Sequence, residues 1–120
     1  MLVAGGYSPI APEVHNLDGS SVAATFSGLG ASALAVTGYP GVIYDEALDR
    51  HLVVYNGSSG IKVLRVHPET WLVDDPSLTG TVPAARPNGI QNSVQYVPEL
   101  KGFVVTSSYR GNIWFVRTSA

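Results

Sequence analysis

The sequence predicts an all-β fold of short antiparallel strands, and three observations support that prediction. Short apolar runs rich in β-branched and aromatic residues recur along the chain, as they do in strands. Glycine and proline, 13 and 8 of the 120 residues, are spread between these runs, where they mark turns. Related segments also return after about 50 residues, a spacing typical of repeated small sheets.

The first part of the chain is expected to form three strands separated by turns. These strands span residues 2–4, 13–17 and 22–26. Gly5 and Gly6 give the backbone freedom for the first turn, and two prolines keep residues 8–12 non-helical. Asp18 followed by Gly19 is a hairpin signal. The predicted arrangement is a meander.

The same alternation of strands and turns continues to the end of the chain. In the middle part, strands are expected at residues 33–37, 41–44, 51–55, 61–66 and 71–73. Residues 45–50 form too short a segment for a packed helix and fit a connection between strands. A proline-containing connection at 77–89 follows, and further strands are expected at 93–96, 103–106 and 112–117.

Composition bounds the function classes. With 45% hydrophobic and 13% charged residues, the chain has enough apolar material for one globular core. A net charge of −2 and a pI near 5.8 provide no basic surface for a phosphate backbone, so no nucleic-acid partner is expected. The absence of cysteine excludes disulfides and thiolate metal sites, but it leaves the compartment unknown.

Neither a membrane segment nor a targeting signal is expected. No apolar run approaches the ~20 residues that a spanning helix needs. Residues 1–6 lack the basic start and long apolar run of a secretory signal.

An internal repeat relates the three parts of the chain. When residues 44–48 are set over 96–100, their tyrosines and leucines align, and residues 52–54 fall over 103–105. Upstream, residues 17–22 fall over 66–71. A unit of this length is a small sheet that cannot bury both of its faces alone.

The repeat resembles the kelch repeat of β-propellers, the propeller family that includes galactose-oxidase-like proteins. The first copy has the diglycine in residues 3–6, then residues 14–18 and a hydrophobic Val22; the middle copy has Asn56-Gly57 and ends at Trp71. The third copy keeps Tyr96, residues 103–105 and Trp114 but has no diglycine, which favours a general resemblance to propeller blades. The resemblance implies repeats of four antiparallel strands.

By this reading, residues 1–120 form one β-repeat domain of about two and a half blades. A partial blade at 1–31, a complete blade at 32–82 and a partial blade at 83–120 supply three, four and three strands. Since propellers close with about 4–8 blades, one chain leaves the ring incomplete. Self-association would complete it, two chains giving five blades; otherwise the chain is a piece of a longer propeller, or it collapses into a sandwich or open barrel. Unpaired strand edges favour a homo-oligomer.

No residue constellation predicts catalysis, a metal or a cofactor. His15, His51 and His67 lack the close pairing of metal-binding histidines. The acidic pairs occur without a calcium-loop signature, and Asp in turns between strands usually serves turn chemistry. No Gly-x-Ser-x-Gly motif or phosphate-binding glycine loop occurs. Asn56-Gly-Ser58 matches the glycosylation acceptor pattern, which is a weak motif.

The candidate ligand-binding residues lie in two connections. Arg86, Asn88, Gln91 and Asn92 offer donors and acceptors for a polar ligand on the loop face of a propeller. The alternative is that they satisfy backbone groups of the loop itself. Tyr109 and Arg110 lie in a turn without an obvious packing role.

These observations favour a non-catalytic binding or interaction module whose loop face takes a polar small molecule or a protein. Two alternatives remain open. One is a propeller-type enzyme whose site is shared between chains. The other is a fragment of a larger propeller without independent activity.

Overall fold

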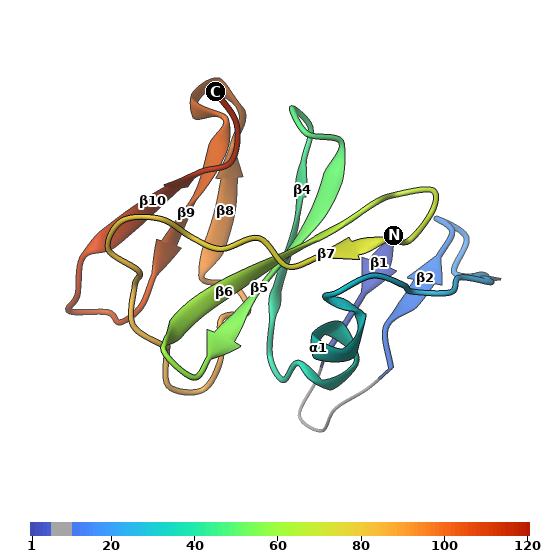
Figure 1. The fold of residues 1–120 in the computed structure, drawn as a ribbon, viewed down its shortest axis with the longest axis horizontal. Coiled ribbons are helices and arrows are strands. Elements are labelled where there is room, and N and C mark those ends of the chain that lie inside the picture. The colour runs from blue at the N-terminus through green and yellow to red at the C-terminus, as the bar shows by residue number, and fades with distance from the viewer. Residues whose placement is uncertain (6–10) are drawn as a thin grey trace.

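The computed structural model describes residues 1–5 and 11–120, and the fold is given for these residues (Figure 1). In chain order the elements are β1 (Leu2–Val3), β2 (Glu13–His15), β3 (Ser21–Val22), α1 (Ala31–Val36), β4 (Gly41–Asp45), β5 (Arg50–Gly57), β6 (Gly60–Val66), β7 (Val73–Asp74), β8 (Val94–Val97), the 3₁₀ helix η1 (Pro98–Leu100), β9 (Gly102–Thr106) and β10 (Ile113–Arg117). Gly6 of the first expected turn and residues 8–10 of the expected non-helical loop lie outside the described residues.

The strands form three antiparallel sheets, each made of strands that follow one another in the chain. The first sheet has the order β1-β2-β3, the middle sheet β4-β5-β6-β7 and the last sheet β10-β9-β8. The all-β, antiparallel character predicted from the sequence is therefore confirmed. None of the three sheets closes on itself.

The middle sheet is buried on both faces because the centres of β5 and β6 are apolar at consecutive positions, 52–54 and 63–64. On β5, Val53 belongs to one hydrophobic cluster, whereas Leu52 and Val54 belong to another. On β6, Leu64 and Val63 divide in the same way. Successive strand residues point to opposite faces, so a continuous apolar run is what a doubly covered sheet requires.

The first sheet and α1 cover one face of the middle sheet. Leu2, Val14 and Leu34 are buried there against Val53 and Leu64. The last sheet covers the other face and forms the second cluster. Its buried members are Leu52, Val54, Ile61, Val63, Ile90, Phe103 and Val105. The molecule is thus a stack of three sheets with two cores between them, seen side by side in Figure 1.

The strand predicted at residues 33–37 is wrong. Residues 33–36 lie in α1 and Thr37 is its C-cap; the Leu34 N–H donates to the Gly30 carbonyl at 3.0 Å, and the Leu34 side chain is completely buried. Alanine is the best helix former, and three alanines lie in this short segment. A brief apolar run does not distinguish a strand from a buried helical turn by its period.

The strand predicted at 22–26 is shorter in the structure, since β3 ends at Val22. The chain continues instead to the outer edge of the middle sheet, where Ser27 forms a parallel bridge with Leu72. The Val73 N–H donates to the Ser27 carbonyl at 2.7 Å. This segment covers the edge of β7 that would otherwise be unpaired.

The helices within residues 1–5 and 11–120 are short, and none has the length and apolar character needed to cross a membrane.

Candidate functional site

The first strands of the three sheets surround one open cavity of about 310 Å³. It is lined by Leu2, Val3 and Ala4 at β1, by Pro40, Gly41 and Val42 at β4, and by Gln91, Asn92 and Val94 at β8. The strand residues of the lining have apolar side chains, but more of its accessible surface is polar than apolar, and Gln91 and Asn92 are among its polar residues. Concave sites of this size with a few polar groups are where small molecules bind.

Gly41 lets β4 approach β8 closely enough to form this cavity. A Cβ atom at Gly41 would lie 2.4 Å from the Cγ2 atom of Val94, which is closer than atoms can pack. Next to it, the Ile90 N–H donates to the Tyr39 carbonyl at 2.8 Å and anchors the chain that leads into β8. The position of Gln91 and Asn92 is therefore fixed by the backbone of the preceding turn.

Asn88, Gln91 and Asn92, three of the predicted site residues, are exposed on this turn. The Gln91 side-chain amide donates to the Asn88 carbonyl at 3.1 Å. Asn88 and Asn92 have φ angles of 67° and 61°, in the left-handed region that asparagine tolerates better than most residues. The asparagines thus serve the backbone of the turn, and the Asn92 side chain also lines the cavity.

Arg86 is held by hydrogen bonds within the protein. Its guanidinium donates to the carbonyl and hydroxyl oxygens of Thr106 at 2.9 and 3.2 Å. Its backbone N–H donates to the Asn56 side chain at 2.8 Å, and the Asn56 amide donates back to the Arg86 carbonyl at 2.6 Å. Arg86 therefore joins the long connection to β5 and β9. The alternative reading from the sequence, that it satisfies groups of the fold, agrees with these contacts.

The same contacts bear on the glycosylation pattern at residues 56–58. The Asn56 side-chain nitrogen, which is the acceptor atom of that pattern, is partly buried and already donates to Arg86. Attaching a sugar to this nitrogen in the folded state would require breaking the paired Asn56–Arg86 hydrogen bonds.

Tyr109 and Arg110 lie on the exposed turn between β9 and β10, and Tyr109 is 87% exposed. The Arg110 guanidinium carbon lies 5.3 Å from the centroid of the Tyr109 ring. Arg86 reaches Thr106 at the start of this turn, but neither Tyr109 nor Arg110 lines the cavity at the first strands. Of the six predicted site residues, Gln91 and Asn92 therefore line the cavity, whereas Tyr109 and Arg110 lie on a separate turn.

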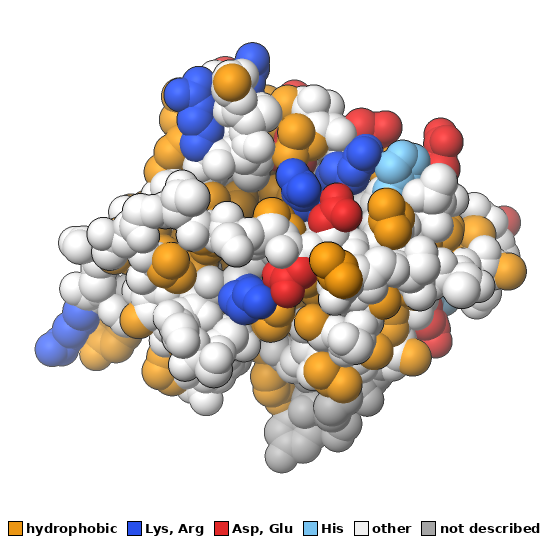
Figure 2. All heavy atoms as spheres, in the orientation of Figure 1, with side chains coloured by type: hydrophobic (Ala, Val, Ile, Leu, Met, Phe, Trp, Pro, Cys, Tyr) orange, Lys and Arg blue, Asp and Glu red, His pale blue; other side chains and the backbone are white. Residues whose placement is uncertain are grey.

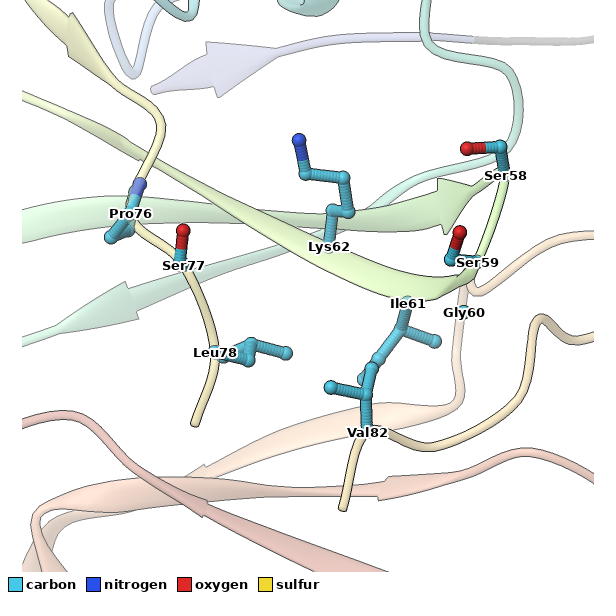
Figure 3. Close-up of a pocket in the computed structure, with 9 residues that line it drawn as sticks. All are labelled: Ser58, Ser59, Gly60, Ile61, Lys62, Pro76, Ser77, Leu78 and Val82. Carbon is cyan, nitrogen blue, oxygen red and sulfur yellow. The ribbon is translucent and has the colours of Figure 1, made fainter. Parts of the chain in front are cut away.

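A second hollow of about 310 Å³ lies where the long connection passes β6 (Figure 3). The side chains of Ile61, Leu78 and Val82 point into the same space, whereas Lys62 points away from it (Figure 3). The Lys62 ammonium is paired with Asp75 at 3.1 Å. This hollow is therefore an apolar seam between β6 and a packed connection, and its cation is already neutralised.

The sequence assigned Asp45 to turn chemistry at a solvated turn but missed its burial: it is a completely buried carboxylate at the end of β4 away from the cavity. One of its oxygens accepts hydrogen bonds from the Ala47 and Leu48 N–H groups and from the Tyr96 hydroxyl, at 3.0, 3.1 and 2.9 Å. The Thr118 hydroxyl donates to the other oxygen. Partial burial, together with the bond to Asp45, raises the pKa of the Tyr96 phenol, which keeps it a donor at neutral pH.

Charges of both signs are interspersed on the face shown in Figure 2, as expected for a chain of small net charge. Among residues 1–5 and 11–120, no three His, Cys, Asp or Glu side chains gather where they could hold a metal ion. The histidines have local partners: His67 Nδ1 lies 3.1 Å from the Glu69 N–H nitrogen, and His15 Nε2 lies 2.9 Å from a Glu13 carboxylate oxygen.

The comparisons with known proteins add no relative. The chain matches no protein-family model, no curated protein and no solved structure.

Proposed function

We propose that this chain is a non-catalytic binding module built from propeller-like blades, with a neutral polar small molecule bound where the first strands converge. The observation that carries this proposal is the cavity itself. It is lined by β1, β4 and β8, which are the first strands of three successive sheets, and by Gln91 and Asn92 on the turn before β8. In a propeller, the first strands of the blades surround the central channel in the same way.

The kelch-like repeat and the order of the sheets support the same proposal. Each sheet is a meander of consecutive strands, and each packs face to face with the next. Propeller blades are sheets of this kind arranged around an axis. The kelch likeness itself rests on the sequence.

The chemistry of the cavity favours binding over catalysis. Gln91 and Asn92 carry neutral amides. Each amide both donates and accepts hydrogen bonds, but it does not act as a general acid or base near neutral pH. The neighbouring Val42 and Val94 offer apolar contact. Alternating hydroxyl and C–H groups match this combination, so carbohydrates are the first ligand class to test. A volume of about 310 Å³ suits a ligand of one or two sugar rings.

Glycan-array screening followed by titration calorimetry tests this proposal. Gln91→Met removes one amide at similar length, and Asn92→Gly removes the other while keeping a residue suited to the positive φ. Each variant is expected to weaken binding of the selected glycan roughly tenfold. The matched control is Asn112→Gly, on the exposed β9–β10 turn, which should leave affinity unchanged. Absence of millimolar or tighter binding by any glycan, or equal affinity in all variants, would contradict the proposal.

A further inference from the structure

The outward face of the last sheet exposes large apolar side chains among polar ones such as Gln95. On β10, Trp114 and Val116 point inward to the second core, while Ile113 and Phe115 point outward with 74% and 44% of their surfaces exposed. Phe115 lies beside Val104 of β9 in the sheet register, which extends the apolar strip across strands. In an isolated domain, such a face leaves water in contact with large apolar side chains.

The outward face of the first sheet forms the other end of the stack. Leu2 and Val14 point inward, and Val3 is 43% exposed on the opposite side of β1. Glu13 and His15 lie on the outward side of β2, alternating with the buried Val14. This face therefore combines an exposed valine with an acidic residue.

Each end face also carries one charged residue of opposite sign. Arg117 follows Phe115 on the outward side of β10 and is exposed, whereas the exposed Glu13 of the first sheet has a carboxylate oxygen 2.9 Å from the His15 ring. Contact between the last sheet of one copy and the first sheet of another brings these opposite charges to the same junction. Electrostatic complementarity of this kind selects the partner face and suppresses alternatives.

The total exposed surface also indicates a missing partner. The chain exposes 7100 Å². A monomeric protein of 12.6 kDa exposes about 6,200 Å² by the usual scaling with mass, which leaves an excess of about 900 Å². A standard protein–protein interface hides about 800 Å² on each partner. The excess is therefore about what one chain buries in a standard interface, and in a closed pair of chains the first and last sheets would share that area.

We propose that two copies of this chain close a ring of six sheets, with the last sheet of each copy packed on the first sheet of the other. Three sheets per chain give six for two chains, within the range of about 4–8 in which such rings close, whereas three chains would exceed it. The sequence predicted about two and a half blades per chain, or five for two chains. The structure has three separate sheets per chain, which makes six for two chains.

The partner copy completes the cavity described above. In the ring, the first strands of both copies face a common axis, so the partner's Gln91 and Asn92 lie across it from the same residues of the first copy. This part of the inference rests on the proposed function. The assembly itself does not, because it is measured on the ligand-free protein.

Sedimentation velocity at micromolar concentration, with light scattering as a second measurement, tests the ring. The expected mass is about twice the 12.6 kDa of one chain. Phe115→Glu on the last sheet and Val3→Glu on the first should each weaken dimerisation roughly 30-fold or more, because a buried charge would replace an apolar contact. Leu29→Glu is the matched control, since Leu29 is 93% exposed and lies on neither end face.

Mixing the two blocked variants distinguishes head-to-tail packing from contact between like faces. The Val3→Glu chain keeps an intact last sheet and the Phe115→Glu chain keeps an intact first sheet, so the mixture is expected to regain dimers through one good junction. Circular dichroism of each variant must match the unmodified protein; where it does not, Ile113→Lys replaces Phe115→Glu on the last sheet and Glu13→Lys replaces Val3→Glu on the first. A monomeric unmodified protein, a dimer insensitive to Val3→Glu, or no recovery on mixing would overturn the proposal.

Discussion

Two hydrogen-bond networks join the middle sheet to the last sheet, one at each end of their strands, and they differ in burial. We call them the Asp45 tie and the Arg86 tie. The Asp45 tie is completely buried and connects β4 to Tyr96 and Thr118. The Arg86 tie is partly exposed and connects the long connection to β5 and β9. The first locks two sheets together, whereas the second orders a turn whose neighbouring side chains stay accessible.

This difference suggests that the Asp45 end of the strands serves stability and the Arg86 end serves binding. The Asp45 carboxylate has both of its oxygens occupied by donors of the fold. Gln91 and Asn92, which follow Arg86 along the chain, instead line a cavity. Substitutions at the two ties should therefore have different effects on unfolding and on binding.

Asp45→Ala is expected to have the largest effect on stability. It removes the acceptor of two backbone N–H groups and two side-chain hydroxyls inside the protein. Unsatisfied buried donors cost about 1–3 kcal/mol each, and partial rearrangement should leave a loss of about 3 kcal/mol in the free energy of unfolding. Urea titration measures this loss, and the melting temperature should fall by roughly 10 °C.

Two variants control for charge and for general loss of an aspartate. Asp75→Ala removes an exposed carboxylate that pairs with Lys62 and should cost at most about 1 kcal/mol. Asp45→Asn keeps one acceptor oxygen, so its loss in the free energy of unfolding should lie between those of Asp45→Ala and Asp75→Ala. If Asp75→Ala destabilised the protein as much as Asp45→Ala, the buried tie would have no special weight.

Arg86→Met should have a smaller effect, about 1–2 kcal/mol, because the lost guanidinium bonds to Thr106 are partly exposed and water can replace them. Arg110→Met is the matched control: that guanidinium contacts the exposed Tyr109 ring, and its loss should cost at most about 0.5 kcal/mol. Chemical denaturation compares the two. Equal effects of both substitutions would mean that the Arg86 tie does not hold the connection.

Short apolar runs rich in β-branched residues predicted most strands, because that composition is local and needs no knowledge of the partner strand. On β5 and β6 the pattern located both strands within one or two residues at each end. It failed at residues 33–37, where a short alanine-rich run has the same apolar content as a strand. The outcome there depends on Leu34 reaching the first core, which is a tertiary contact that local patterning does not contain.

The candidate site was predictable in part for a similar reason. The polar side chains of the connection, placed on the loop face of a propeller, identified Gln91 and Asn92, but their convergence with β1 depends on how three sheets stack. Asp45 was assigned to turn chemistry; its burial was missed because its contacts with Tyr96 and Thr118 join residues that are far apart in the chain.

The smallest expected effect concerns the other face of the Asp45 end, where His51 lies opposite Tyr44 in the sheet register. The His51 ring stacks on Trp71 with a centroid distance of 6.1 Å and an interplanar angle of 12°. Burial lowers the pKa of His51 from its ordinary value near 6.5, the N-terminal ammonium lowers it further, and Asp49 opposes this shift.

Lowering the pH should therefore weaken the fold through His51. Because the unfolded chain binds the proton more readily, the stabilisation from neutral His51 is fully present above pH ~6.5 and is lost as the pH falls below that value toward the lower folded pKa. Urea titrations between pH 7.5 and 5 should show a steeper decline for the unmodified protein than for His51→Gln, which does not titrate. His15 and His67 are unchanged in both proteins, so the difference in slope reports His51 alone. Parallel slopes would mean that the Trp71 stack tolerates the imidazolium.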